Sequence, residues 1–522
     1  MNIEHVEKSY QELESDSTLQ NLIAQANARY ILYNTEESKE NFPRYTIKDE
    51  QLNILAFKYL NIGCNYFSEH NYLKASHSLE KGALILEYIH GSIHIQTKNK
   101  KLFCLISALS YYVCFQYSKA FILIGKLESD TMISSLVSLF LNRKFDQLLS
   151  EIDKLITNSS YGDEYLAEHF EEDNATKIYE IIIAKSLNYY VQFYQTGNKD
   201  FLEIAKKDLV NLQEVAAMRG EPDVWWVIRL LLLIIDGFKE SSLWYVLGNY
   251  FNTEDKLPLK YIQSLVYKNG SITELFLTQR NSLPKVLNNK QGSIVSIPTS
   301  SGKTRIGEIA ILNCLLNEPK AKILFIAPYR SLAYEIENSF DEIFSNLDVS
   351  VSHLYGGSLF SKLDERIIDE SSVIVATPEK AKALFRSNED ILSCIKLVII
   401  DEGHLLGTDK RLIVNEMFYE ELKYHVKANG GRFLLLSAVL PNAEDLSEWL
   451  TDSTDNVYKE NWRPSDERIG IMEWNGVSVN LNWKSTDAER NSFNPNFIMR
   501  QKLPKKPKER KCITFLKIRT KP

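Results

Sequence analysis

The sequence predicts two structural classes in one chain: an all-α first half, and then an α/β domain whose parallel sheet is covered by helices on both faces. Residues 1–265 place apolar side chains at helical spacing and contain few strand signals. After Asn269 and Gly270, short β-branched runs alternate with helical segments, which is typical of parallel strands buried on both faces. We therefore expect a helical domain at 1–265, an α/β domain at 266–460, and a linker, hairpin and basic tail at 461–522.

The first half is expected to form antiparallel helical pairs. The segments NYLKAS (71–76) and QYSKAF (116–121) share a Tyr-x-Lys-Ala core. Helix–turn–helix repeats often place an aromatic and a small residue near their turns. Two matches leave two interpretations open, a true repeat array or a chance similarity within an ordinary all-α domain.

No segment of the sequence indicates a membrane protein. The most apolar run, VWWVIRLLLLII (224–235), is shorter than the ~20 residues of a membrane span, so we expect a core helix. The N-terminus is polar and acidic, unlike a signal peptide. The six cysteines have no C-x-x-C spacing and lie mostly in apolar segments, which is typical of reduced, buried thiols rather than metal ligands. We expect a cytoplasmic protein.

The net charge of −7 hides an uneven distribution. Residues 500–522 contain ten Lys or Arg and one acid, so this tail carries +9 and the rest of the chain carries −16. The overall charge therefore does not indicate a nucleic-acid-binding protein, and any such contact must be a local stripe. Solvated disorder is the simplest interpretation of the tail.

Six apolar runs are the expected strands of the parallel sheet: 293–297, 322–327, 349–354, 372–376, 396–401 and 432–437. Ligands of such sheets bind at the carboxyl ends of the strands. The chemically informative motifs of this chain all follow strands, so we expect them to meet at one edge.

A phosphate-binding loop is predicted after the first strand, where the sequence reads IPTSSGKT. A strand–loop–helix turn directs backbone N–H groups and a helix N-terminus at one anion. The strict pattern has Gly at the first position, where this chain has an isoleucine, and a lone Gly-Lys-Thr also occurs in surface turns. The predicted nucleotide-binding residues are Ile297, Pro298, Thr299, Ser300, Ser301, Gly302, Lys303 and Thr304.

An acidic pair follows the fifth strand in IIDEGH (399–404). Alone, Asp-Glu would be interpreted as a helix N-cap. Together with the phosphate-binding loop, it predicts a phosphoryl-transfer site. Asp401 would hold Mg²⁺ through its water shell, with a hydroxyl ligand from Thr304. Glu402 would orient and deprotonate the attacking water, and Lys303 would neutralise the β- and γ-phosphates.

In this order the motifs resemble superfamily 2 nucleic-acid helicases of the DExH type, nearest the Ski2-like group, over residues 271–483. The resemblance implies a RecA-like ATP-binding domain with ATP and Mg²⁺ as cofactors, and it implies that Gln279 reads adenine. DEGH corresponds to motif II and SAVLPNAEDLSEWL (437–450) to motif III, with NWRPS (461–465) leading toward a second lobe.

The same resemblance implies sites for nucleic acid. APYRSLA (327–333) corresponds to motif Ia and TPEK (377–380) to motif Ib. Arg330, Gly356, Gly357 and Thr377 are the expected contacts to one strand's backbone, although Arg330 could instead form a surface salt bridge. His404 and Ser437 are expected to couple the two sites, because Val439 replaces the threonine usual in motif III.

The family also has a second RecA-like lobe with an arginine finger, which we expect to be missing here. After a hairpin with Asn475 and Gly476 as its turn, only a polar, lysine-rich stretch follows. A frameshift, a truncated gene and a split protein remain open. We expect the chain alone to bind ATP, to hydrolyse at most traces of it, and to unwind no duplex.

The segment PDVWWVIRLLLLIIDGFKESSLWYVL (222–247) is similar to helicases of bacterial antiviral defence systems, among them the helicase subunit of the Hachiman system. The resulting hypothesis is an ATP-dependent helicase or translocase that acts on DNA in antiviral defence, together with a partner protein. An ATP-binding sensor or interaction module without unwinding activity, and an RNA helicase, remain alternatives.

Overall fold

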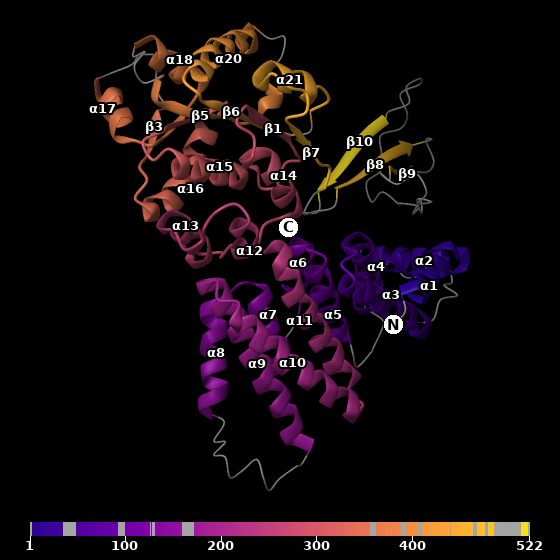
Figure 1. Ribbon diagram of the computed structural model, residues 1–522. Coiled ribbons are helices and arrows are strands. Elements are labelled where there is room, and N and C mark those ends of the chain that lie inside the picture. The colour runs from indigo at the N-terminus through magenta and orange to yellow at the C-terminus, as the bar shows by residue number, and fades with distance from the viewer. Residues whose placement is uncertain are drawn as a thin grey trace. The chain divides into compact units, whose positions relative to one another are not determined.

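The chain forms two compact units in the computed structural model, and each is considered by itself (Figure 1). The first, here the helical unit, comprises residues 1–191, 198–237 and 464–522. The second, the sheet unit, comprises residues 192–197 and 238–463. The domain limits drawn from the sequence stay a prediction. The structure describes residues 3–34, 49–91, 100–125, 127, 131–158, 172–354, 362–387, 393–405, 410–438, 440–462, 467–474, 479–484 and 513–519.

The N-terminal region is helical, as predicted. Its helices are α1 (Ile3–Ser15), α2 (Ser17–Asn34), α3 (Asp49–Ser68), α4 (Tyr72–His90), α5 (Lys100–Val113), α6 (Tyr117–Ile124), α7 (Met132–Leu141), α8 (Phe145–Asn158), α9 (Glu172–Thr196), α10 (Asp200–Arg219) and α11 (Pro222–Ser241). The apolar run 224–235 lies within α11, and its aliphatic side chains from Val227 onward are buried, which confirms the core helix. Among the described helices, none has the length and apolar character needed to cross a membrane.

Three helical hairpins have the same type of turn between their helices. Between α3 and α4, His70 has a left-handed backbone (φ 59°), and the N–H groups of His70 and Asn71 donate to the carbonyls of Phe67 and Tyr66. The turns α5–α6 and α7–α8 repeat this pattern of hydrogen bonds, with Phe115 and Arg143 in the left-handed conformation. The segments NYLKAS and QYSKAF thus start α4 and α6 after equivalent turns, which confirms the helical pairs.

The sheet unit contains seven parallel strands in the order β3-β4-β2-β5-β6-β1-β7 (Figure 1). They are β1 (Gly292–Ser296), β2 (Lys322–Ile326), β3 (Val351–Leu354), β4 (Val373–Ala376), β5 (Ile395–Ile400), β6 (Arg432–Ser437) and β7 (Val457–Lys459). All six predicted strands are present. The seventh, β7, is too short to produce an apolar run and was not predicted.

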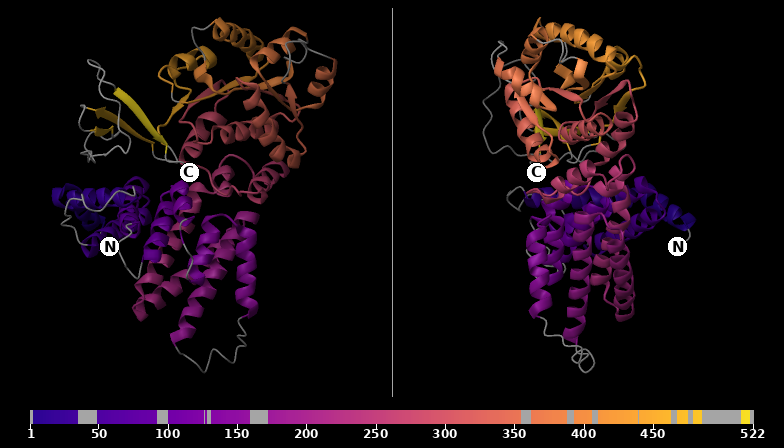
Figure 2. Two further views of the ribbon diagram at one scale, coloured as in Figure 1. Left: turned by 180° about the vertical axis from the view of Figure 1, so that it is seen from behind. Right: turned by 60° about the vertical axis from the view of Figure 1, so that its left-hand side comes forward.

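Helices cover both faces of this sheet, as the views in Figure 2 show. On one face lie α14 (Leu277–Leu287), α15 (Lys303–Asn317) and α16 (Arg330–Phe344), and on the other lie α18 (Pro378–Ser387), α20 (Lys410–Ala428) and α21 (Ala443–Thr451). This is the RecA-like fold that the sequence predicts, and the described residues contain one such lobe. The remaining helices of the unit are α12 (Leu243–Gly248), α13 (Lys256–Tyr267) and α17 (Lys362–Glu370).

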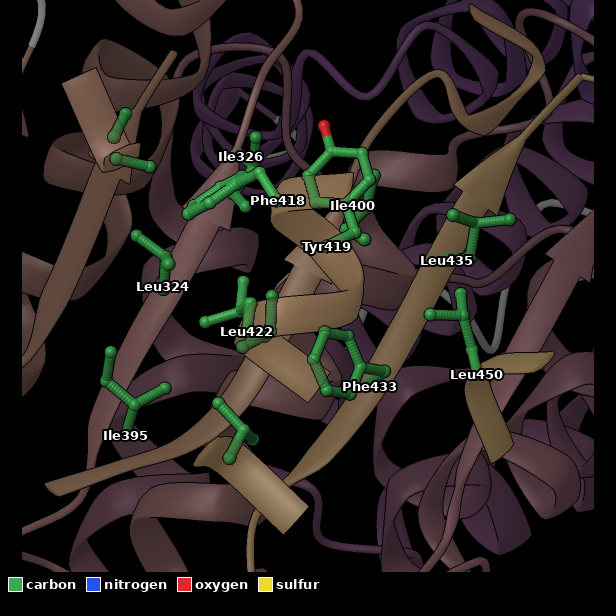
Figure 3. Packing of buried hydrophobic residues seen from close by; sticks show 14 of the residues in the cluster. Leu324, Ile326, Ile395, Ile400, Phe418, Tyr419, Leu422, Phe433, Leu435 and Leu450 are labelled. Atoms are coloured by element: carbon green, nitrogen blue, oxygen red, sulfur yellow. The ribbon is translucent and has the colours of Figure 1, made fainter. Parts of the chain in front are cut away.

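The core between the sheet and α20 is continuous and apolar. Leu324, Ile326 and Leu435 from the strands pack with Phe418 and Leu422 from α20 (Figure 3). Alternate strand residues face the other helical layer, where the Phe325 ring contacts Phe340 of α16. Burial on both faces explains why these strands have unbroken apolar sequences.

A buried polar cluster joins α13 to α15. The Tyr261 hydroxyl donates to Oε2 of Glu308 (3.1 Å), and the Arg305 guanidinium donates to the same oxygen. Burial raises the pKa of the Glu308 carboxyl, against the opposing effect of Arg305. Since Arg305 lies only two residues after Lys303, α13 supports the start of α15.

A small antiparallel sheet, β10-β8-β9, belongs to the helical unit. Strands β8 (Glu467–Trp474) and β9 (Val479–Lys484) form the predicted hairpin, although its turn residues Asn475 and Gly476 lie outside the described residues. Strand β10 (Ile513–Arg519) pairs with β8, so the interpretation of the whole basic tail as disordered is wrong for these residues.

The described cysteines are all free thiols. Cys64, Cys104, Cys114 and Cys314 are buried, as expected. The expectation is wrong for Cys394, which is exposed just before β5 because the apolar run begins only at the next residue.

Removal of core volume should destabilise the sheet unit. We expect Ile395→Ala to lower the free energy of unfolding by about 2–5 kcal/mol, because Ile395 is fully buried and its loss leaves a cavity. Urea unfolding measures this change. The matched control is Ile413→Ala on α20, where the side chain is 45% exposed. Equal losses in the two variants would contradict the assigned core.

Candidate nucleotide-binding site

The site lies where β1, β5 and β6 end. In the sheet β6 pairs with both β1 and β5, and all three run in the same direction. Their carboxyl ends therefore bring the loop after β1, the acidic turn after β5 and Ser437 to one edge. The N–H of Ile297 donates to the Ser437 carbonyl (3.1 Å), which extends the pairing of β1 and β6 up to the loop.

The loop after β1 turns sharply through two left-handed residues, Ser300 (φ 73°) and Gly302 (φ 76°). The left-handed backbone at Gly302 favours glycine, and a Cβ atom there would also lie 2.1 Å from Nε2 of Gln279. Helix α15 begins at the next residue, Lys303. The first N–H groups of a helix have no partner within it, and they attract anions.

The environment of Ile297 explains why the loop does not need glycine at its first position. Its side chain is fully buried, and its backbone is not in the left-handed region. Glycine is therefore not needed there. Of the other loop residues, Pro298 and Ser301 are buried, whereas Thr299 and Ser300 are exposed.

An ion pair joins the loop to the acidic turn. The Lys303 ammonium lies 3.2 Å from both carboxylate oxygens of Glu402. Glu402 has a left-handed backbone (φ 52°), and its Oε2 lies 3.0 Å from Nδ1 of His404. A Cβ at Gly403 would lie 2.6 Å from the Leu435 side chain, so glycine lets the acidic turn pack closely against β6.

Asp401 is 9% exposed and continues the strand pairing, since its N–H donates to the Ile326 carbonyl (2.9 Å). Burial and the nearby charge of Glu402 raise the pKa of Asp401 to about 6, while Lys303 opposes the shift. One ammonium thus faces two carboxylates in a poorly solvated place. This excess of negative charge, with the half-buried Thr304 hydroxyl in the same loop, fits a divalent cation.

Gln279 on α14 contacts the loop directly. Its Oε1 accepts from the Phe276 N–H (2.8 Å), and its Nε2 donates to the Gly302 carbonyl (3.0 Å). A side-chain amide has two N–H donors and two acceptor lone pairs. These two bonds leave one donor and one acceptor of the Gln279 amide unused, although the residue is only 5% exposed.

The two residues predicted to couple the sites meet. Nδ1 of His404 lies 3.5 Å from Oγ of Ser437, so the acidic turn contacts the end of β6. Val439 lies outside the described residues.

The predicted nucleic-acid residues differ in accessibility. Arg330 is exposed at the first position of α16. Thr377 is 3% exposed just before α18, so its hydroxyl is not presented at the surface. Gly356 and Gly357 lie outside the described residues. A cavity of about 40 Å³ is lined by Tyr329 of motif Ia, Pro378 of motif Ib and Asp401.

Two aromatic residues beside the loop were not predicted as site residues. Ser301 Oγ donates to the Trp462 carbonyl (3.4 Å), and the Trp462 ring contacts that of Phe276. NWRPS was noted in the sequence, but a contact between residues so distant in the chain leaves no local signal.

Comparison with known proteins agrees with this geometry. The family described as DEAD/DEAH box helicase matches residues 277–446. The chain is 41% identical over 500 residues to the Hachiman protein HamB of Bacillus cereus, covering 95% of this chain and 44% of that protein. It is 33% identical over 218 residues to the ATP-dependent DNA helicase Hel308 of Thermococcus kodakarensis, covering 42% of this chain and 18% of that protein.

Among solved structures, the DUF1998 helicase MrfA bound to DNA has 18% identity and a TM-score of 0.35, over 41% of this chain and 30% of that one. The chain spans less than half the length of the two relatives named above. It nevertheless carries the helicase motifs in order and aligns over nearly its whole length with HamB. Residues 277–446 therefore form a domain of the DEAD/DEAH box helicase family, and the similarity to these relatives supports a common ancestry with ATP-dependent helicases.

Proposed function

We propose that this chain is the ATP-binding part of a helicase or translocase that moves on DNA in bacterial antiviral defence. The observation that carries the proposal is the ion pair between Lys303 and Glu402, placed beside Asp401 at one edge of a parallel sheet. Similarity to HamB supports the role in defence. Similarity to Hel308, which is named a DNA helicase, supports DNA rather than RNA.

The loop at 297–304 is proposed to hold the triphosphate of ATP. Its left-handed turn and the start of α15 supply backbone N–H donors, and Lys303 supplies a positive charge. In the free protein this charge is paired with Glu402. A triphosphate carries more negative charge than one carboxylate, so Lys303 would move to it and release Glu402. The remaining donor and acceptor of Gln279 match the N6 and N7 edge of adenine.

Asp401 and Thr304 are proposed to hold Mg²⁺, which would supply neutralising charge at the β- and γ-phosphates. Asp401 is suited to this role because burial and Glu402 disfavour its negative charge, and an adjacent cation would relieve that cost. Two hydrogen bonds hold Asp401 in place: its backbone N–H donates to the Ile326 carbonyl, and its Oδ1 accepts from the Glu402 N–H.

Glu402, once released, is proposed to orient the attacking water and accept its proton. His404 would hold the Glu402 carboxylate through the 3.0 Å contact between them. Because His404 also contacts Ser437, a change at the acidic turn would reach the end of β6. This contact is the proposed coupling between ATP and nucleic acid.

Arg330 is the proposed nucleic-acid contact best supported by its exposure. The cavity shared by Tyr329, Pro378 and Asp401 supports the view that the nucleic-acid motifs adjoin the ATP site. A contact by Thr377 requires that its buried side chain become accessible. The likeness to a protein of the Hachiman defence system also supports a partner protein of the same system. The four buried free thiols support a cytoplasmic location.

Loss of the loop lysine should weaken ATP binding. We expect Lys303→Ala to reduce the affinity of the 522-residue chain for MgATP at least about tenfold, because a charge-assisted contact to phosphate is lost. Isothermal calorimetry measures the affinity. The control is Lys320→Ala, which removes an exposed lysine from the turn between α15 and β2. Equal ATP affinity in all three proteins would refute the assignment of the loop.

Replacing the acid in the acidic turn should separate binding from chemistry. We expect Glu402→Gln to retain ATP binding and to slow hydrolysis about 10²–10⁴-fold, because an amide cannot accept the proton. Single-turnover assays with protein in excess over ATP detect even slow hydrolysis. Hydrolysis at the unsubstituted rate would show that Glu402 is not the base. ATP binding without hydrolysis in the unsubstituted protein, with or without DNA, would favour the sensor alternative.

Arg330 should contribute to DNA binding independently of sequence. We expect Arg330→Ala to weaken the binding of single-stranded DNA and to lower the slope of log affinity against log salt by about 0.7, the value for one phosphate contact on a single strand. Fluorescence anisotropy across a salt series measures both quantities. The control is Arg386→Ala, which removes an exposed arginine at the end of α18. An unchanged salt slope in Arg330→Ala would exclude a phosphate contact.

A further inference from the structure

An aromatic pair beside the phosphate loop has no role in the function proposed above. Phe276 immediately precedes α14, and Trp462 follows β7. Their ring centroids are 6.0 Å apart, and the ring planes are inclined by 48°. Both residues are only half-buried, so part of each side chain remains accessible.

Trp462 is bonded to a side chain of the loop, and Phe276 lies near the loop through its neighbour Gln279. Ser301 Oγ donates to the Trp462 carbonyl (3.4 Å). Gln279, on the first turn of the helix that follows Phe276, donates to the Gly302 carbonyl (3.0 Å). A Cβ atom placed on Gly302 would lie 3.6 Å from Cδ2 of the Phe276 ring. The aromatic pair therefore stands next to any ligand that the loop holds.

The base is the part of a nucleotide that the loop itself does not contact. Backbone N–H groups and Lys303 suit phosphate, and Gln279 can bond only to the edge of a base. The rings of Phe276 and Trp462 supply flat apolar surface beside that amide. Packing of a base on an aromatic side chain contributes ~1–3 kcal/mol. Two inclined rings form a corner, in which a base can stack on one ring and meet the other edge-on.

We propose that Trp462 contacts the nucleobase and, with Phe276, forms the wall against which the base of the bound ATP packs. The proposal rests on the proposed function of the loop as an ATP site. It assigns a specificity-determining role to a residue outside the segment matched by the helicase family, which ends at residue 446.

The test compares ATP with inorganic tripolyphosphate, which has no base. The full 522-residue chain and its variants are titrated with each ligand and Mg²⁺ by calorimetry. Trp462→Ala should weaken ATP binding about tenfold and change tripolyphosphate binding less than about twofold, because only the base loses a stacking partner. Trp462→Phe should recover most of the ATP affinity, since it restores a ring.

A matched control is Trp225→Ala, which removes a half-buried tryptophan from α11 and should leave both affinities unchanged. If Trp462→Ala does not fold, Trp462→Leu replaces it, because leucine keeps apolar volume without a ring.

Unchanged ATP affinity in the ring-free variant overturns the proposal. So does an equal loss for ATP and tripolyphosphate, since Trp462 would then act only by holding the loop. If the unsubstituted chain binds tripolyphosphate and ATP equally well, the base wall fails while the phosphate site stands. If it binds neither, both proposals fail.

Discussion

The parallel pairing of β1, β6 and β5 is the constraint on which the candidate site depends. Because these strands run in one direction, the phosphate loop, the acidic turn and Ser437 meet at one edge. Backbone hydrogen bonds continue past the strand ends, from Ile297 to Ser437 and from Asp401 to Ile326. These backbone bonds position the loop and the turn independently of their side chains. A change that shifted β6 would therefore move both halves of the site together.

The electrostatics of the site follow from this placement. The strand ends place three charged side chains where they are largely shielded from water: Lys303, Asp401 and Glu402. A single ammonium cannot balance two carboxylates. Burial in the first place, and the nearby charge of Glu402 in the second, raise the pKa of Asp401. An ordinary structural ion pair would be close to neutral, and it would have no need for two successive acidic residues. The uncompensated negative charge is the physical reason to interpret this cluster as a cation-binding site, whereas the N–H groups of the loop and Lys303 are the reason to expect phosphate beside it.

Residues on both sides of the recognisable helicase segment contribute to the site. Upstream, Tyr261 of α13 is buried against Glu308 of α15, five residues after Lys303. Downstream, Trp462 contacts Ser301 and the ring of Phe276. The helix that starts at Lys303 is thus supported by a helix before the matched segment, and the loop is supported by the residues after β7. Both supports lie outside residues 277–446, the segment that matches the helicase family.

The sequence by itself determined the parallel sheet, because strands that are buried on both faces must be apolar without interruption. It also predicted the loop and the acidic turn, because phosphate chemistry demands particular residue types at short spacing. It also indicated helical pairs from a short shared segment. The third hairpin turn, at Arg143, escaped notice because its geometry is a backbone property and lacks the Tyr-x-Lys-Ala core. Strand β7 escaped because three residues make no pattern. Only the tertiary structure decided that Ile297 is tolerated, that Thr377 is buried and that Trp462 reaches the loop, since burial and contacts between distant residues depend on how the whole sheet unit packs.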